Sequence, residues 1–207
     1  MKRMRPGQCA RMAAAVLILA MAPGLQAQVP SPSPSPSPSP SQISIETAGQ
    51  GNLITVAASA DMQVEARAVW DAITDYDHLA DFIPDMSASR VLERDGDKLL
   101  VEQKGQFRFL LFRQAVEVRM EVVESPQRRI VARAVSGNVK EFDGVYAVER
   151  LPAGVVRLSY SGRLIPDFPV PPVVGALVVR SVLAKQFSAL VDEIVRRDES
   201  ARGIRQP

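Results

Sequence analysis

Apolar residues alternate with polar ones at the start of the patterned part of this chain, and the period changes soon afterwards. From Ile54 to Val64 the apolar residues fall on every second position, which is the period of a strand with one buried face. Beyond Glu65 the period becomes helical, with one apolar stripe formed by Val69, Ile73 and Tyr76. Asp77 can cap a second short helix, which Pro84 closes. The pattern therefore predicts a first strand followed by two short helices.

The alternating pattern then returns in a series of segments separated by short turns. Six further strands are predicted, at 88–94, 98–112, 114–124, 130–136, 142–151 and 156–164. Consecutive strands joined by short turns favour an antiparallel meander over parallel crossover units.

A long helix is predicted after the last strand. Pro171 and Pro172 suit its entrance, and its buried stripe consists of Ala176, Val179, Leu183, Phe187, Leu190 and Ile194. The first two turns, 173–179, are apolar on every side. Such a segment is either deeply buried or faces something apolar, so it could form the movable mouth of a cavity. Together these elements place the domain in the α+β class.

The first residues have the pattern of a secretory signal peptide. A cationic front precedes the uncharged run from Met12 to Ala22, and the small residue Ala27 stands before Gln28. We expect a cleaved signal at 1–27 and an exported, periplasmic protein; an uncleaved membrane anchor is the alternative. Residues 28–51, rich in Pro and Ser, are expected to form a disordered linker, either a stalk or a spacer with no specific task. The domain is predicted at 52–198, followed by a disordered tail at 199–207.

Removal of the signal peptide changes what composition implies. The formal charge of +2 includes four cations and no acids from this segment, so the mature chain carries −2 and its composition does not point to nucleic acid. Cys9, the single cysteine, leaves with the signal, which excludes a disulfide, a thiolate nucleophile and a zinc–sulfur site. His78 is the single histidine, so a histidine-based metal cluster is excluded; it either caps a helix in solvent or lines a pocket mouth.

A group of aspartates around the break between the two predicted short helices is a candidate metal site. Asp75, Asp77, Asp81 and Asp85 straddle a helix break and lack the glycine turn and final glutamate of a calcium loop. Helix capping and solvent exposure are the favoured interpretation. The sequence thus predicts no catalytic residue, no metal and no cofactor.

The order of elements resembles the START-like superfamily, also called helix-grip or SRPBCC, and in particular its polyketide cyclase/dehydrase and coenzyme Q-binding branch. The resemblance covers about 52–197 and rests on segments 69–77, 82–84, 89–91, 142–146 and 162–166. It implies a curved seven-stranded antiparallel sheet wrapped around a long C-terminal helix. The superfamily includes lipid carriers, plant hormone receptors, quinone-binding chaperones and polyketide ring-closing enzymes, so membership alone does not select a function.

The resemblance also implies an internal cavity for a hydrophobic small molecule. We expect carriage or sequestration of a lipid, an isoprenoid quinone or a polyketide-like compound, with the entrance at 172–183 and 82–84. Transient membrane contact is possible, nucleic acid is not expected, and the oligomeric state is open. One alternative is a cyclase or dehydratase that uses the same cavity, which is less favoured because no activated acid–base pair is evident. The other is a module that binds a protein or membrane surface without a ligand.

The residues predicted to line the cavity occupy aromatic positions and polar positions that share an apolar strand face. Gln103 shares the face of Val101, and the tyrosines can place a ring in the core and a hydroxyl in a pocket or at its rim. Arg133 would need an anionic partner, either a ligand head group or a glutamate. The full set of predicted ligand-binding residues is Trp70, Phe82, Val101, Gln103, Phe107, Phe109, Val118, Met120, Arg133, Tyr146, Tyr160, Val179, Leu183 and Phe187.

Overall fold

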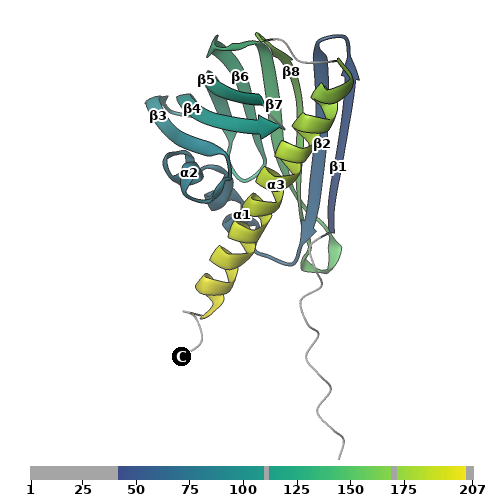
Figure 1. The fold of residues 1–207 in the computed structure, drawn as a ribbon. Coiled ribbons are helices and arrows are strands. Elements are labelled where there is room, and N and C mark those ends of the chain that lie inside the picture. The colour runs from purple at the N-terminus through teal and green to yellow at the C-terminus, as the bar shows by residue number, and fades with distance from the viewer. Residues whose placement is uncertain (1–41, 110–111, 169–171, 204–207) are drawn as a thin grey trace, which may run out of the picture. The chain divides into compact units, whose positions relative to one another are not determined.

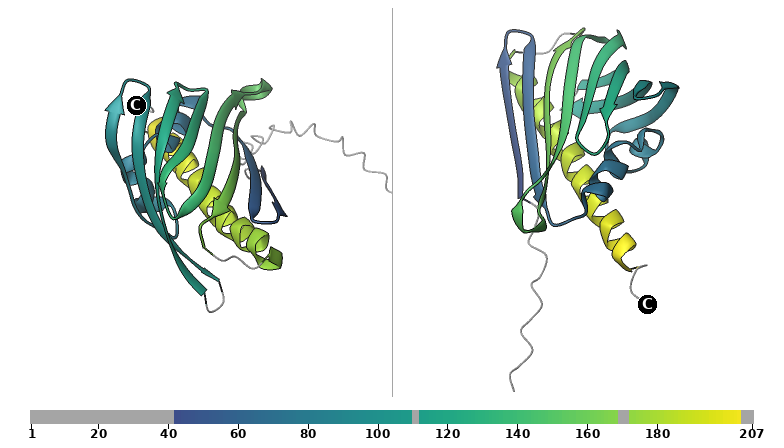
Figure 2. Two further views of the ribbon diagram at one scale, coloured as in Figure 1. Left: turned by 90° about the horizontal axis from the view of Figure 1, so that it is seen from above. Right: turned by 180° about the vertical axis from the view of Figure 1, so that it is seen from behind.

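A computed structural model of the chain describes residues 42–109, 112–168 and 172–203, with the backbone alone described at 107–109, 112 and 172–174. The predicted signal peptide and most of the predicted linker lie outside the described residues. Figures 1 and 2 show a bent antiparallel sheet with the long helix α3 (Pro172–Gly203) across its inner face. This is the helix-grip arrangement that the sequence predicts.

The sheet has eight strands in the order β1-β2-β8-β7-β6-β5-β4-β3, and every neighbouring pair is antiparallel. The strands are β1 (Gln42–Gln50), β2 (Leu53–Met62), β3 (Met86–Asp95), β4 (Lys98–Phe109), β5 (Phe112–Ser125), β6 (Arg129–Gly137), β7 (Val139–Arg150) and β8 (Val156–Pro166). From β3 to β8 each strand pairs with the next, which confirms the predicted meander.

The eighth strand is β1, which the sequence analysis assigned to the linker. It pairs along its whole length with β2, from Gln42 opposite Asp61 to Gln50 opposite Leu53. The break at Gly51, taken as a domain boundary, is instead the tight turn of a β-hairpin. Because β1 is an edge strand with few buried residues, its apolar signal is weak. The predicted start at Asn52 is therefore wrong by at least ten residues.

The helices lie close to their predicted places. α1 (Ala66–Ile73) buries the face carrying Val69 and Ile73, and a 3-10 turn, η1 (Tyr76–His78), leads into α2 (Leu79–Phe82). Asp77 does not cap a helix as expected, because its carboxylate accepts the N–H of Val91 in β3 at 2.8 Å. A second 3-10 turn, η2 (Pro152–Gly154), joins β7 to β8.

The last turns of α3 extend into the segment expected to be a disordered tail. The Asp198 carboxylate is buried, accepts the N–H of Glu65 at 2.9 Å and pairs with Arg202 at 2.7 Å. Arg202 also donates to the Gln63 carbonyl at 3.2 Å. These contacts fix the end of α3 against the entrance of α1, so the helix continues to Gly203.

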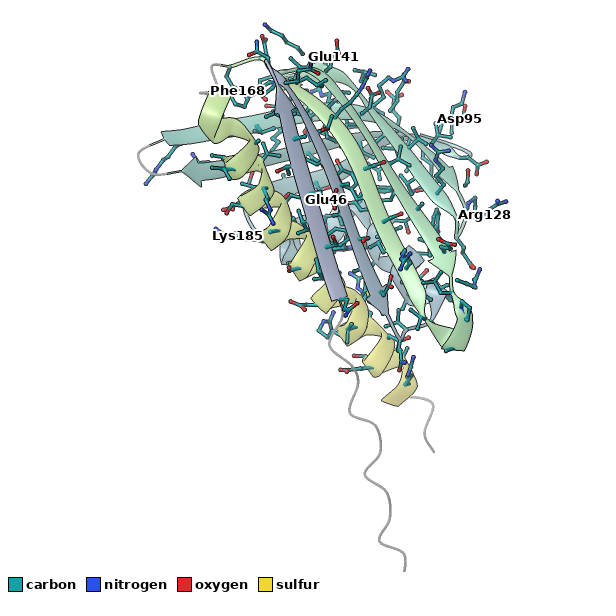
Figure 3. The ribbon with its side chains drawn as sticks, turned by 90° about the vertical axis from the view of Figure 1, so that its right-hand side faces the viewer. Glu46, Asp95, Arg128, Glu141, Phe168 and Lys185 are labelled. Atoms are coloured by element: carbon teal, nitrogen blue, oxygen red, sulfur yellow. The ribbon has the colours of Figure 1, made fainter. Side chains whose placement is uncertain are left out.

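The two faces of the sheet differ in chemistry. The inner face and α3 form the core, in which the largest fully buried side chains are Phe187, Leu158, Ile194, Val69, Val101 and Val191. Charged side chains such as Glu46, Arg128 and Lys185 lie at the surface (Figure 3). Among the described helices, none is long and apolar enough to span a bilayer.

Ion pairs cross the outer face from strand to strand. Asp143 on β7 accepts from Arg133 on β6 at 2.9 Å and from Arg163 on β8 at 2.8 Å, and these three residues are register partners. The hydrogen bonds from Arg163 and Arg133 hold the pKa of Asp143 below its usual range. On β4, the buried Glu102 carboxylate accepts from Arg119 and Arg90. We call this set of pairs the outer ladder.

Candidate functional site

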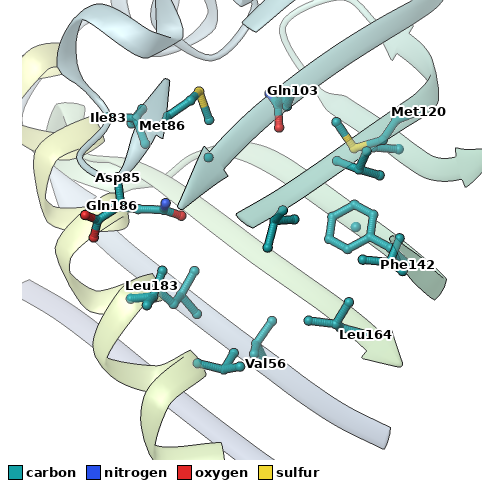
Figure 4. Close-up of a pocket in the computed structure, with 18 of the residues that line it drawn as sticks. Val56, Ile83, Asp85, Met86, Gln103, Met120, Phe142, Leu164, Leu183 and Gln186 are labelled. Carbon is teal, nitrogen blue, oxygen red and sulfur yellow. The ribbon is translucent and has the colours of Figure 1, made fainter. Parts of the chain in front are cut away.

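A cavity of about 510 Å³ lies between the inner face of the sheet and α3 (Figure 4). Strands β2 and β4–β8 line it on one side and α3 on the other, while η1, α2 and the loop after α2 contribute at one end. Its volume is in the range of pockets that hold lipids and drug-sized molecules.

The wall is predominantly aliphatic and aromatic. Ile54 and Val56 of β2 and Leu183 of α3 line the hollow, and Phe142 and Leu164 come from paired positions of β7 and β8. Ala132 and Gly144 also line the hollow and contribute little or no side chain to it. The start of α3, expected to form the entrance, supplies Gly175, Val178, Val179 and Val182 to the wall.

Nine residues of the predicted set line this cavity. They are Val101, Gln103, Val118, Met120, Tyr146, Tyr160, Val179, Leu183 and Phe187. Their contact with a ligand remains a prediction.

Three other predicted residues lie elsewhere. Arg133 is on the outer face, 74% exposed and bound to Asp143, because its strand position has the opposite parity to Ala132. Trp70 is half-buried beside the core, while Ile73 is the α1 residue that reaches the cavity. The Arg197 guanidinium of α3 lies over the Phe82 ring, 5.3 Å from the ring centre, so the face of this ring contacts α3. The side chains of Phe107 and Phe109 lie outside the described residues.

Several lining residues were missed by the sequence analysis. Ile54, Phe142 and Gly144 could have been found, since each shares the parity of an inner-face residue already identified. Asp85 and Gln186 could not, because a loop and a helix from distant parts of the chain bring them together.

Two tyrosines lie side by side on the floor of the cavity. Tyr146 and Tyr160 are register partners on β7 and β8, with ring centres 4.7 Å apart and planes tilted by 40°. The Tyr160 ring lies over the paired glycines Gly144 and Gly162. A Cβ at Gly162 would come within 2.6 Å of the Tyr160 Oη, and one at Gly144 within 3.2 Å. Glycine at both positions therefore allows this ring to lie along the sheet.

The two hydroxyls are neutral donors. Burial raises the pKa of Tyr146 to about 12, and burial together with the neighbouring Tyr146 raises the pKa of Tyr160. No hydrogen bond to either hydroxyl is formed by the described residues.

A third tyrosine closes one end of the cavity. The Tyr76 hydroxyl is buried without a hydrogen-bond partner among the described residues, and burial and the nearby Glu124 carboxylate raise its pKa. All three tyrosines stay protonated at neutral pH, so they can donate hydrogen bonds but cannot act as bases.

Other polar residues also reach the wall of the cavity. Asp85 is exposed and has a positive φ of 63°, and its carbonyl accepts the Gln106 N–H at 2.9 Å. Gln186 of α3 donates to the Pro84 carbonyl at 3.1 Å and lies beside Asp85 in Figure 4. Gln103 donates to Ser89 at 3.4 Å.

The histidine and acidic groups outside the cavity do not form a metal site. His78 is exposed and bonded to Asp75 at 2.6 Å, which raises the pKa of the imidazole. Within the described parts of the chain, no three His, Cys, Asp or Glu side chains are grouped so that they could hold a metal ion.

Comparison with known proteins agrees with this geometry. Residues 62–191 match the family described as polyketide cyclase / dehydrase and lipid transport. The chain belongs to this family. The match begins at the end of β2 and ends within α3, so it includes most of the strands and helices that enclose the cavity.

Solved structures share the fold of this polyketide cyclase / dehydrase family member. The Zhui aromatase/cyclase from a Streptomyces species is 16% identical with a TM-score of 0.58, covering 74% of this chain and 97% of that one. A STAR-related lipid transfer protein fragment from Xanthomonas axonopodis is 13% identical with a TM-score of 0.58, covering 73% and 93%. A START superfamily protein from Mycobacterium smegmatis is 13% identical with a TM-score of 0.56, covering 71% and 98%. No curated protein matched the chain.

Proposed function

We propose that this protein binds a hydrophobic small molecule in the cavity and carries or sequesters it. The observation that supports this most directly is an apolar hollow of about 510 Å³ enclosed by the sheet and α3. Transfer of apolar surface from water into such a space is favourable by about 25 cal/mol per Å². A lipid, an isoprenoid quinone or a polyketide-like compound has the apolar area to use it.

Carriage is favoured over catalysis because of the groups that reach the interior. Acid–base catalysis needs a group whose pKa lies near the working pH. The three tyrosines have raised pKa values and remain protonated, and Asp85 lies exposed at the edge. A cyclase or dehydratase would need a proton acceptor that the described lining residues do not supply in the interior.

The proposal includes export and a brief encounter with a membrane. Export is supported by the pattern of residues 1–27, which lie outside the described residues. The mass of the mature protein isolated from cells would test it, since cleavage after Ala27 removes a defined segment.

Native ligand can be sought directly. The exported protein is purified from cells without detergent, extracted with organic solvent, and the extract is examined by mass spectrometry. We expect one recurring apolar compound in near-stoichiometric amount. A clean extract from folded protein that also fails to take up a neutral apolar dye would refute the proposed function.

Filling the cavity provides a matched test. Ala132 lines the hollow from the inner face of β6, whereas Val135 on the same strand is 49% exposed. Ala132→Trp places an indole in the ligand space, so we expect affinity for N-phenylnaphthylamine to fall at least about tenfold, which corresponds to 1.4 kcal/mol. Val135→Trp adds the same ring elsewhere and should leave binding unchanged. Equal dye affinities for the two variants would contradict a contribution of β6 to the binding site.

A further inference from the structure

Two hydroxyls on the cavity floor have no hydrogen-bond partner among the described residues. Tyr146 and Tyr160 both line the hollow, and no hydrogen bond to either Oη is formed within the described parts of the chain. Neither oxygen is among the fully buried unpartnered side-chain atoms, so both can reach what occupies the hollow. A bound molecule with an oxygen acceptor at this point would receive these hydrogen bonds, whereas a wholly apolar molecule would leave the hydroxyls unpaired.

The Tyr160 hydroxyl is held in place by the backbone beneath it. Because the paired residues Gly144 and Gly162 have no side chain, the phenol ring of Tyr160 lies against the backbone of the sheet, with its Oη over Gly162. The Tyr146 ring packs beside it, with ring centres 4.7 Å apart. The two donors therefore lie side by side on paired strands, with the Tyr160 ring against the backbone of the sheet.

The charges around the cavity argue against an anionic head group. Among the described residues, two cationic ones contribute to the wall, and each side chain is bound to acids of the outer face: Lys104 to Glu117 at 2.9 Å and Arg163 to Asp143 at 2.8 Å. The described acids near the hollow are Asp85 at its edge and Glu124 beside Tyr76, and Glu124 is paired with Arg94 at 3.8 Å. A buried carboxylate or phosphate would thus lose its hydration without gaining a cation.

We propose that Tyr146 and Tyr160 form a subsite for an uncharged oxygen acceptor, such as the carbonyl of a ketone, quinone or ester. This inference rests on the proposed function, since it names the ligand chemistry of the same cavity. The carbonyl end of the ligand lies on the β7–β8 floor, and its apolar remainder lies against α3, β4 and β5. Free fatty acids and phosphate-bearing lipids are then poor ligands.

Three probes of one ring shape test the inference. Fluorenone, fluorene and fluorenecarboxylate compete with N-phenylnaphthylamine for the purified protein, and their dissociation constants are compared. We expect fluorenone to bind at least about fivefold more tightly than fluorene, since one net hydrogen bond is worth about 1 kcal/mol. Fluorenecarboxylate should bind more weakly than fluorene.

Variants then identify the donors. Tyr146→Phe and Tyr160→Phe keep the rings and remove the hydroxyls that fluorene leaves unpaired. Fluorene should therefore bind at least as tightly as before while the preference for fluorenone falls, and that preference should vanish in the double variant. Gly162→Ala displaces the Tyr160 hydroxyl and should reduce the preference as Tyr160→Phe does, with no further loss when the two are combined. Thermal melts establish that each variant is folded.

The possible failures are distinguishable. If fluorene and fluorenone bind equally to the unmodified protein, or if the preference survives in the double phenylalanine variant, the tyrosine subsite is wrong while the binding cavity stands. Binding of fluorenecarboxylate as tightly as fluorenone would refute the uncharged specificity. If the dye binds but none of the probes displaces it, the tyrosine subsite is wrong and the proposed function stands. If the protein takes up neither the dye nor any probe, the proposed function fails and this inference fails with it.

Discussion

A carboxylate on α3 provides a stability test that can be worked out from its partners. Glu193 accepts two hydrogen bonds from Arg196, both at 2.7 Å, and one from Arg197 at 2.7 Å. Arg197 continues to Asp75 at 2.9 Å, so the network joins α3 to the segment between α1 and η1. The hydrogen bonds from Arg196 and Arg197 lower the pKa of Glu193 from 4.5 to about 2.

The size and sign of the effect of Glu193 on stability follow from the difference between its two pKa values. Each pKa unit corresponds to 1.36 kcal/mol, so the full difference between folded and unfolded states would be about 3 kcal/mol at neutral pH. Arg196 is 65% exposed, and solvent screening reduces the expected contribution to about 1–2 kcal/mol. Because the pKa is lower in the folded state, this stabilisation is present above about pH 5 and is lost as the pH falls toward 2.

Glu193→Gln removes the titrating group and is measured by urea unfolding at pH 7 and at about pH 3. At pH 7 the variant should be less stable than the parent by about 1–2 kcal/mol, and at pH 3 the gap should be roughly half as large or smaller. Glu199→Gln is the control, since Glu199 is exposed on the same helix and has no ion pair with another described residue. A gap that stays constant with pH, or that equals the control's effect, would refute the reasoning.

Substitutions at three further positions test the core and the end of α3. Asp198→Ala leaves the Glu65 N–H without its buried acceptor and should lower the free energy of unfolding by about 1–3 kcal/mol in urea titrations, with a smaller loss for Asp198→Asn; equal losses would contradict the role of the acceptor. Phe187→Ala should cost about 3–5 kcal/mol and also alter dye affinity, because this ring borders the cavity. Ile194→Ala, which removes a fully buried side chain outside the lining, should cost about 2–5 kcal/mol and leave dye affinity unchanged. A similar change of affinity in both would place the dye elsewhere.

The fold could be predicted from the sequence wherever one face of an element is buried. The strands β2 to β8 and the helix α3 carry clear two-residue or helical periods, since alternate residues such as Val101 and Leu158 are fully buried. β1 gives no such signal, because it pairs through its backbone and buries few side chains. The length of α3 was underestimated because the hydrogen bond from the Glu65 N–H to Asp198 joins residues that are far apart in the sequence.

The candidate site was predicted in part. The correct and incorrect predictions differ in whether the residue was assigned to the right face of its strand. Residues such as Val118 and Tyr160 were chosen because they share an inner strand face, and they line the cavity. Arg133 was predicted to line the cavity because it shares a strand face with Val131 and Val135, but that face is the outer one. The packing of the Tyr160 ring on Gly144 and Gly162 could not be predicted, because it depends on the pairing of β7 with β8.

The outer ladder has a consequence for how such a protein can change over evolutionary time. Asp143 and its two arginines link β6, β7 and β8 on the solvent side, where their ion pairs add to the backbone pairing of these strands. These ion pairs do not depend on the identity of inner-face residues such as Ala132. A substitution of similar volume on the inner face can therefore alter the shape of the hollow while these links between the strands remain.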